Sequence, residues 1–178
     1  MAEKDVARDA DLQAHIRADW KIVHSLLENL SAMFPLQSRA RFRAYASAAQ
    51  DNLAYNTWVK VVLGTANYNP GGHFSTSTST FTAPSDGQFV LTGQVAVSTA
   101  QNSKRYLVAI YVNDTAVSQT MVTSSSTGEN AYIPISDIIE VASGALITLY
   151  IKSMQGDSTA DIITGSTNSF LAGHILSF

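Results

Sequence analysis

Several side chains in this sequence are of kinds that bind metal ions or transfer protons, so their spacing is considered first. His15 and His24 are nine positions apart in a helical pattern, so they do not form an i, i+4 metal-binding pair. His73 follows Pro-Gly-Gly and is expected to be an exposed turn residue. Asp157 and Asp161, in QGDSTAD, are the best oxygen-ligand pair for calcium, although a solvated loop explains them better. We predict no required metal ion.

The sequence also lacks the motifs of common catalytic sites. It contains no cysteine, which excludes disulfides, thiolate metal sites and cysteine nucleophiles. It has no GxSxG nucleophile elbow, no phosphate-binding loop, no HExxH zinc motif and no glycine-rich dinucleotide fingerprint. We therefore expect a protein that is not an enzyme and that uses no cofactor.

Charge and hydropathy disfavour two further classes of partner. The net charge is −3, and the nearest feature to a basic patch is Arg39, Arg41 and Arg43, which a solvated sheet edge explains best. We therefore expect no nucleic-acid partner. No apolar run reaches the roughly 20 residues that span a bilayer, so no membrane insertion is expected. The charged start MAEKDVARDADLQ does not resemble a secretory signal, and we expect a chain made in a cytoplasm.

The distribution of glycine and charge divides the chain into two regions. All ten glycines lie at Gly64 or later. The chain has 11 basic and 14 acidic residues, and ten of these charged residues lie in the first 30 positions. Glycine is unfavourable inside helices, and charges commonly decorate helix surfaces. We predict a helical coiled-coil or docking segment at residues 1–38 and a β-rich head at residues 39–178.

The helical segment has one apolar seam with the spacing of a coiled coil. Its members follow at steps of 4, 3, 4, 3 and 4: Ile16, Trp20, Val23, Leu27, Leu30 and Phe34. Pro35 ends the pattern. Trp and Phe at such positions suit a bundle wider than two strands, or a groove on another protein. Trimerisation and docking therefore both stay open, beside the alternative that the helix packs on its own domain.

From about Arg39 onward the signals favour strands. Residues 88–97 alternate, and five of them share one face: Phe89, Leu91, Gly93, Val95 and Val97. RYLVAIYV at 105–112 and ALITLYI at 145–151 are nearly continuous apolar runs, as expected for strands deep in a sandwich. Asn113-Asp114, SSSTGEN and VASGAL mark connections. The pattern predicts a β-sandwich or barrel, of which a jelly roll is one form.

The serine- and threonine-rich stretch STSTST at 75–80 is predicted to be a strand rather than a linker. Ser77, Ser79 and Phe81 would point one way and the threonines of 76–82 the other, since threonine is a good strand former. Pro70-Gly71-Gly72 would be the turn before it and residues 83–87 the turn after it. The stretch is therefore interpreted as part of a hairpin.

One segment, residues 61–95, carries a recognisable motif. An Asn and a Gly pair precede an aromatic residue, and Phe-Thr-x-Pro-x-x-Gly-x-aromatic follows. The segment resembles the first half of the globular head of complement component 1q, a branch of the tumour necrosis factor superfamily. The likeness continues through AIYVND, EVASGALITLYI and NSFLAGHIL, and covers about 140 residues from Arg39 to Phe178. The matching positions are Asn69, Gly71, Gly72, Phe74, Phe81, Thr82, Pro84, Gly87, Phe89 and Gly173.

This resemblance implies a fold and an assembly. The family's head is a jelly roll that forms a tight non-covalent trimer about a threefold axis. We therefore expect an all-β jelly-roll sandwich of about ten strands behind an N-terminal α-helix, assembled as a homotrimer. Three heads on one axis would gather three N-terminal helices, which agrees with the coiled-coil interpretation of the seam.

Three positions depart from the family's pattern. Ala145 stands where the family has Asp, Ser79 where it often has Gly, and His174 where it usually has an aromatic residue. Near a threefold axis, three copies of His174 could meet and bind an ion or respond to pH; a hydrogen-bonded, partly buried histidine is the favoured alternative. Some family members bind calcium near the trimer apex, which is why Asp157 and Asp161 were considered as ligands.

These expectations lead to a functional hypothesis. A trimer made in a cytoplasm and displayed outside the cell fits a bacteriophage or phage-like particle, which leaves by lysis. RFRAYASAAQDNLAYNTWVKV at 41–61 also resembles the first strands of bacterial and phage versions of the domain. We expect a structural virion protein, such as a head or tail fibre, a spike or a capsid decoration protein. Its helix would bind a capsid or tail protein, and its knob would serve host attachment, with a surface glycan as one candidate ligand. The alternative is a leaderless bacterial cell- or spore-surface adhesin trimer.

Overall fold

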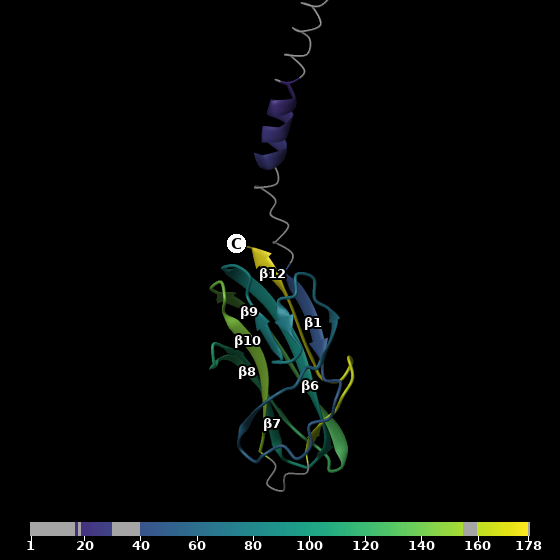
Figure 1. Ribbon diagram of the computed structural model, residues 1–178. Coiled ribbons are helices and arrows are strands. Elements are labelled where there is room, and N and C mark those ends of the chain that lie inside the picture. Colours follow the sequence, from purple (N-terminus) through teal and green to yellow (C-terminus); the bar gives the residue numbers. More distant parts are fainter. Residues whose placement is uncertain (1–16, 18, 30–39, 155–159, 178) are drawn as a thin grey trace, which may run out of the picture. The chain divides into compact units, whose positions relative to one another are not determined.

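The computed structural model describes residues 17, 19–29, 40–154 and 160–177, in two compact units, Met1–Ser38 and Arg39–Phe178 (Figure 1). In the first unit, residues 17 and 19–29 are helical, so the expected N-terminal helix is present. Ile16, Leu30 and Phe34 of the predicted seam lie outside the described residues. No helix in the described part of the chain is long and apolar enough to cross a membrane.

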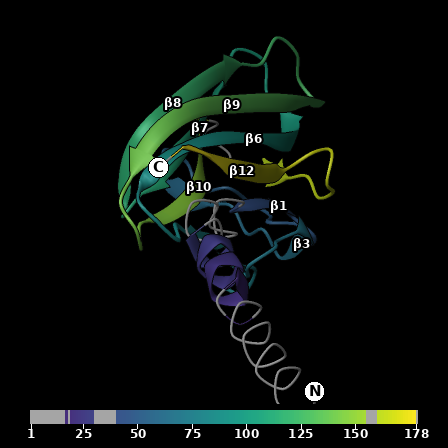
Figure 2. The same cartoon turned by 90° about the horizontal axis from the view of Figure 1, so that it is seen from above.

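The second unit, the head, is a sandwich of two antiparallel sheets, as predicted (Figure 2). Sheet A runs β3 (Thr65–Tyr68), β1 (Arg41–Tyr45), β12 (Phe170–Ser177), β6 (Gly87–Ala100) and β9 (Glu129–Val141), and β11 (Asp161–Ile162) also pairs with β6. Sheet B runs β4 (Phe74–Ser75), β5 (Thr80–Thr82), β10 (Leu146–Ser153), β7 (Arg105–Val112) and β8 (Thr115–Thr123), and β2 (Trp58–Lys60) also pairs with β10. This is the expected jelly-roll architecture.

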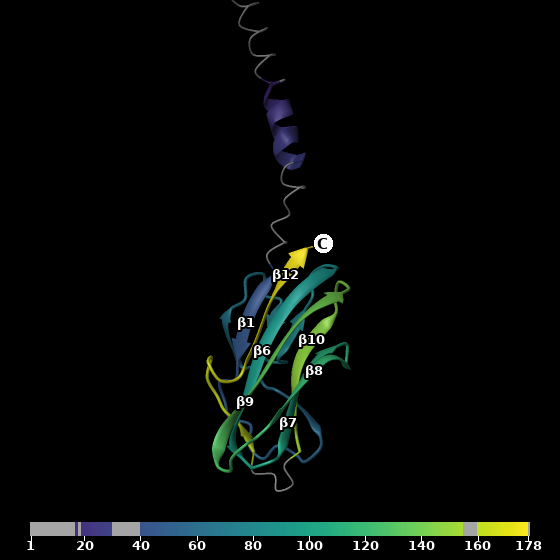
Figure 3. The ribbon, with the colours of Figure 1, turned by 180° about the vertical axis from the view of Figure 1, so that it is seen from behind.

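The strand register separates two ends of the head. Arg41 lies opposite His174, so β12 ends beside the start of β1, which Figure 3 shows from behind. The long strand β6 starts at this end and runs to the other, where the β6–β7 and β8–β9 turns lie together. These turns therefore lie at the end of the head opposite to the start of β1.

The core lies between the sheets and is built from the inward phase of each strand. The five predicted positions of β6, Phe89, Leu91, Gly93, Val95 and Val97, are all buried, which confirms that face. Tyr106, Val108 and Ile110 of β7 meet them from sheet B. Fully burying a valine, leucine or phenylalanine side chain contributes about 1.5–3 kcal/mol, so these inward positions stabilise the sandwich.

Strands β7 and β10 are central in sheet B, as expected for strands deep in the sandwich. Their inward side chains are buried, and so are Ala109 and Thr148 in the outward positions, but other outward side chains keep part of their surface open. Tyr111 and Tyr150 are half-buried on the outer face, and Leu146 is exposed. The apolar character of their outward positions therefore has a cause other than the core.

The prediction of a strand through the serine–threonine run was wrong. Residues 76–79 form a turn between β4 and β5, and Ser79 has a φ of 51°, which a strand does not allow. The Ser75 hydroxyl accepts a hydrogen bond from the backbone N–H of Thr78 (3.3 Å), so the side chains compete with ladder pairing. The hairpin itself is present, because Phe74 pairs with Phe81 across it.

The predicted connections are confirmed. Asn113 and Asp114 both have positive φ, of 47° and 62°, as a two-residue hairpin turn between β7 and β8 requires. Gly144, with a φ of 81°, turns the chain between β9 and β10. The Asn113 side chain also accepts a hydrogen bond from the backbone N–H of Leu146 (2.9 Å), which ties this turn to the neighbouring strand.

Candidate functional site

The outer face of sheet A carries apolar side chains that are open to solvent in the single chain. Ile138 is 58% exposed, Leu176 49% and Tyr132 47%. Val90 of β6 lies between Ile138 of β9 and His174 of β12 in the register, so neighbouring strands contribute to one row. We call Val90, Ile138 and Leu176 the apolar face; Tyr132 points from the same sheet surface but lies six residues along β9 from Ile138, beyond Pro134 and Ser136. An exposed apolar group on several adjacent strands is typical of an interaction surface.

His174, the predicted threefold-axis residue, lies exposed beside the apolar face, with Arg41 opposite it on β1. Of the three arginines considered as a basic patch, Arg39 lies outside the described residues. Arg43 is held in place: its guanidinium lies 3.8 Å from the centre of the Phe170 ring and donates a hydrogen bond to the Ser166 carbonyl oxygen (2.6 Å). Its contacts are those of a packed side chain on a sheet surface.

The family-motif residues build the fold rather than a reactive site. The Asn69 side chain brackets the turn between β3 and β4, donating to the carbonyl oxygen of Phe74 (2.8 Å) and accepting from its N–H (3.0 Å). Gly71 and Gly72 supply the positive φ angles, 84° and 70°, that this turn needs. Thr82 donates its N–H to His73 (2.8 Å), which closes the hairpin. Pro84 and Gly87 flank the connection from β5 to β6.

The aromatic members of the motif form one cluster in the core. Phe42 stacks on Phe81 with ring centres 4.4 Å apart and on Phe74 at 5.1 Å, while Phe89 meets Phe81 edge-on at 5.7 Å. Gly173 makes room for this cluster, because an added Cβ would lie 2.6 Å from a methyl group of Leu91 and 3.0 Å from the Phe42 ring. The glycine of the final strand is therefore explained by packing.

Every described residue of the N-terminal helix is exposed, including the three described seam residues. Trp20 is 68% exposed, and Val23 and Leu27 are exposed as well. Ile22 and Leu26, also exposed, extend the apolar surface to an arc of about 160° at 100° per residue, wider than a two-stranded coiled-coil seam. Such a width suits a bundle or a groove.

The side chains considered for metal binding or proton transfer have other places in the structure. Asp161 accepts a hydrogen bond from the backbone N–H of Asn52 (2.7 Å), a structural contact, and its partner Asp157 lies outside the described residues, as does His15. His24 lies 3.4 Å from Glu28 one helical turn away. His73 is half-buried against the edge of Phe81, so the exposed position expected for it was wrong. Among the described residues, no group of three His, Cys, Asp or Glu side chains could hold a metal ion.

A shallow pocket of about 260 Å³ lies at the far end of the head, between the end of β8 and the start of β9. It is lined by Val122, Thr123, Ser124, Ser125, Ser126, Glu129, Asn130, Ala131 and Tyr132. The Ser124 hydroxyl donates to the Ser126 carbonyl oxygen (2.8 Å), and the Ser126 hydroxyl donates to the Glu129 carboxylate. Three of the polar residues that line the pocket, Ser124, Ser126 and Glu129, are therefore bonded within the loop.

Comparison with solved structures decides the fold. The globular domain of zebrafish complement 1qA protein superposes with a TM-score of 0.56 at 11% identity, over 77% of this chain and 97% of that one. Murine APRIL at pH 5.0 superposes with a TM-score of 0.59 at 11% identity, over 78% of this chain and 99% of that one. The head has a C1q- and tumour necrosis factor-like fold. No protein-family model and no curated protein sequence matches the chain significantly.

The outward-facing residues of the C1q-like head are those that sequence reasoning missed. Ile138 points outward from β9, as do Pro134, Ser136 and Glu140. An apolar residue among the outward positions of an alternating strand can be detected in the sequence. Tyr111 and Tyr150 carried no such signal, because their strands are apolar in both phases and the alternation that distinguishes inside from outside is lost.

Proposed function

We propose that this protein is a non-enzymatic, homotrimeric structural and adhesion protein of a bacteriophage or phage-like particle. In this proposal the C1q-like head is the exposed knob of a fibre, spike or decoration protein. The N-terminal helix attaches the knob to a capsid or tail protein. Three observations support this proposal: the C1q-like fold of the head, the exposed apolar face of sheet A, and the resemblance of the first strands of the head to bacterial and phage versions of the domain.

The apolar face of sheet A is the observation that carries the trimer. Ile138 and Leu176 are each about half exposed or more in a single chain. Removing such side chains from water contributes about 1–3 kcal/mol each to the free energy of association. In a threefold assembly every such contact occurs three times. The row through Val90 consists of Ile138, Val90 and His174 followed by Arg41, and the exposed Glu140 lies in the next row, opposite Gln88.

The helix supports attachment without specifying its partner. Trp20, Val23 and Leu27 leave a broad apolar surface uncovered within the described residues of the first unit. An isolated helix of this length is marginal in water and gains its stability from what covers its apolar face. Three copies of the helix, or one groove on a particle protein, would each supply that cover.

Assignment to a particle rests on residues 41–61, which resemble the first strands of bacterial and phage versions of the domain. The alternative is a bacterial cell- or spore-surface adhesin trimer, which would use the same head. Mass spectrometry of purified particles from the source organism is expected to find the chain. If the chain instead occurs only in cell-surface or spore-coat fractions, the adhesin is the correct assignment.

The trimer is tested separately by the solution mass of the full chain from light scattering. A mass of three chains is expected over a wide range of protein concentration. A mass of one chain, unchanged on concentration, would overturn the trimer and with it the proposed use of the apolar face.

A further inference from the structure

The outer face of sheet B carries a cluster of aromatic and basic side chains that the core does not require. Trp58 and Lys60 of β2 alternate with Val59, which packs against the core. In the register Lys60 lies opposite Tyr150 and Trp58 opposite Lys152, both on β10. Tyr111 of β7 completes the group on the same outer face. We call Trp58, Lys60, Tyr111, Tyr150 and Lys152 the aromatic–lysine patch.

The rings of this patch are held by one another. The centre of the Tyr111 ring lies 5.9 Å from that of Trp58, nearly edge-on at 71°, and 4.3 Å from that of Tyr150, tilted at 39°. All three side chains are half-buried, so a ligand would meet rings that have already lost most of their rotational freedom. Rigid aromatic side chains with polar tips are efficient contact residues because little conformational entropy is lost on binding.

The two lysines give the patch a positive charge in a chain whose net charge is −3. The Lys152 ammonium lies 5.3 Å from the centre of the Trp58 ring, and the Lys60 ammonium donates a hydrogen bond to the Thr80 hydroxyl (3.0 Å). Among the described residues, neither lysine forms an ion pair with a carboxylate. Burial lowers the pKa of Lys60 and Asp114 raises it, which places one carboxylate within electrostatic reach at the edge of the patch.

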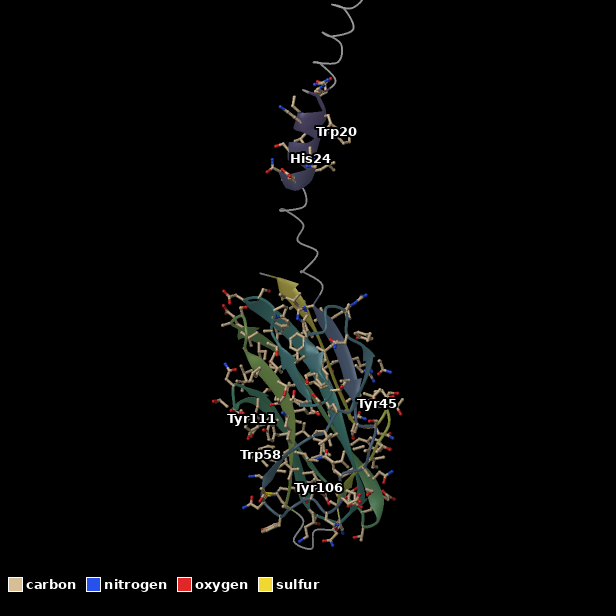
Figure 4. All side chains as sticks on the ribbon, viewed as in Figure 1. Trp20, His24, Tyr45, Trp58, Tyr106 and Tyr111 are labelled. Atoms are coloured by element: carbon tan, nitrogen blue, oxygen red, sulfur yellow. The ribbon has the colours of Figure 1, made fainter. Side chains whose placement is uncertain are left out.

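The position of the patch keeps it accessible in the proposed trimer. Sheets A and B are the two layers of the sandwich, so a surface on the outer face of sheet B points away from the apolar face of sheet A. In Figure 4, Trp58 and Tyr111 lie on one flank of the head and Tyr45, a sheet A residue, lies on the other. Each trimer would therefore present three copies of the patch on its outside.

We propose that the aromatic–lysine patch binds an acidic saccharide, of the uronate or sialate class, displayed on a cell surface. The C–H face of a sugar ring packs against the electron-rich face of an aromatic ring, and a carboxylate on that sugar accepts hydrogen bonds from lysine ammonium groups. The patch offers both groups side by side, and its positive charge complements the ligand's negative charge. The inference deepens the proposed function, on which it rests for a cell-surface ligand.

Titration of the full chain with defined oligosaccharides tests the proposal. The chain has two tryptophans, so in a Trp20→Phe background the fluorescence reports Trp58 alone. The probes are a hexagalacturonate, a hyaluronan hexamer and sialyllactose, each at low and high salt, with the methyl ester of the hexagalacturonate as its uncharged match. Binding of at least one acidic probe is expected, weakened by salt, and the ester should bind about tenfold more weakly than the acid if that hexamer is the ligand.

Substitutions within the patch distinguish its contribution from general electrostatic attraction. Lys152→Gln and Lys60→Gln are each expected to weaken binding of the acidic probe about tenfold, as for the loss of one charge-assisted hydrogen bond. Lys104→Gln, in the β6–β7 turn, is the matched control and is expected to leave binding unchanged. The proposal is overturned if no acidic probe binds, if the ester binds as well as the acid, or if Lys104→Gln weakens binding as much as the patch variants.

Light scattering on the same samples separates this inference from the function on which it rests. A trimer that binds no acidic probe would reject the aromatic–lysine patch as a saccharide site and leave the trimeric head intact. A monomer that binds the acidic probe with the expected dependence on Lys60 and Lys152 would support the site and reject the trimer.

Discussion

The two outer faces of the head differ although both sheets share one core. Sheet A presents aliphatic side chains, Ile138 and Leu176, that are about half exposed. Sheet B also has exposed aliphatic side chains, such as Met121 and Leu146, but in addition it presents rings that pack on one another: Trp58, Tyr111 and Tyr150, all half-buried. A loose aliphatic surface gains most from a second protein surface, whereas a rigid aromatic surface with adjacent charge gains most from a polar ligand.

This difference shows where the information about function lies in such a fold. The side chains that point inward from each strand pack in a hydrophobic core, which any jelly roll needs whatever its function. The side chains that point outward do not have to fill the core, so apolar and aromatic residues among them have to be explained by what covers them. We expect variants on the two faces to separate association from ligand binding.

The largest effect is expected from Ile138→Arg in the head fragment, residues 39–178. Three added charges would meet at a threefold interface, and burying unpaired charges is strongly unfavourable. Light scattering is expected to show a monomer at concentrations where the unsubstituted fragment is a trimer. Val117→Arg is the matched control, because Val117 is similarly exposed (46%) on β8 of sheet B, and it is expected to leave the trimer intact. Equal masses for the two variants would contradict the assignment of the interface.

A second prediction concerns the packing that supports sheet A. Gly173→Ala would place a methyl group 2.6 Å from Leu91 and 3.1 Å from the Val90 carbonyl oxygen, so β12 has to shift. We expect a loss of about 1–3 kcal/mol in the free energy of unfolding, measured by denaturant titration. Gly64→Ala is the control, since its added methyl meets only the Ser47 hydroxyl, at 2.7 Å, on an exposed side chain that can rotate away. Similar losses for both variants would show that the close approach at Gly173 is unimportant.

A third prediction addresses sheet B. Trp58→Ala removes one ring contact with Tyr111 and the cation–π partner of Lys152, so it should lower the free energy of unfolding by about 1 kcal/mol. The variant is nevertheless expected to stay a trimer with the same dissociation behaviour, measured by light scattering on dilution. A Trp58→Ala variant that dissociates would show that the two faces are not independent.

The smallest effect is expected at alkaline pH. Burial, and next the charge of Tyr150, raise the pKa of Tyr111 above its usual value of 10.0. Because the folded state then holds this proton more tightly, the phenol's contribution to stability is complete below about pH 10 and is lost as pH rises through the higher folded pKa. The difference in tyrosinate absorbance between the unsubstituted chain and Tyr111→Phe is expected to have its midpoint above pH 10. In Tyr150→Phe the Tyr111 midpoint should move down; an unchanged midpoint would mean that the two rings do not interact.

Much of this fold could be predicted from the sequence because its determinants are local. The period of two in residues 88–97 gave the buried face of β6, and Asn113-Asp114 gave the turn after β7. The turn at residues 76–79 was not predicted. Serine and threonine hydroxyl groups can form hydrogen bonds with the nearby backbone, as Ser75 does with Thr78, in place of the bonds between paired strands. Composition alone does not distinguish these two outcomes. The close approach at Gly173 depends on Phe42 and Leu91, which are far away in sequence.

The candidate surfaces were less predictable than the fold. The helix seam was predicted from spacing alone and stays a prediction, since every described helix residue is exposed. The apolar face and the aromatic–lysine patch required the register, because strands from distant parts of the chain contribute to each. Their outward orientation could be assigned only once the inward phase of each strand was known.

The trimeric head is tested by the solution mass of the head fragment, residues 39–178, beside that of the full chain. Both are expected to be trimers, because the apolar face of sheet A is sufficient for association and the helix is then free to attach elsewhere. A monomeric fragment with a trimeric full chain would mean that the helices hold the assembly together. Monomers in both cases would contradict the trimeric head and leave the apolar face of sheet A without the proposed role.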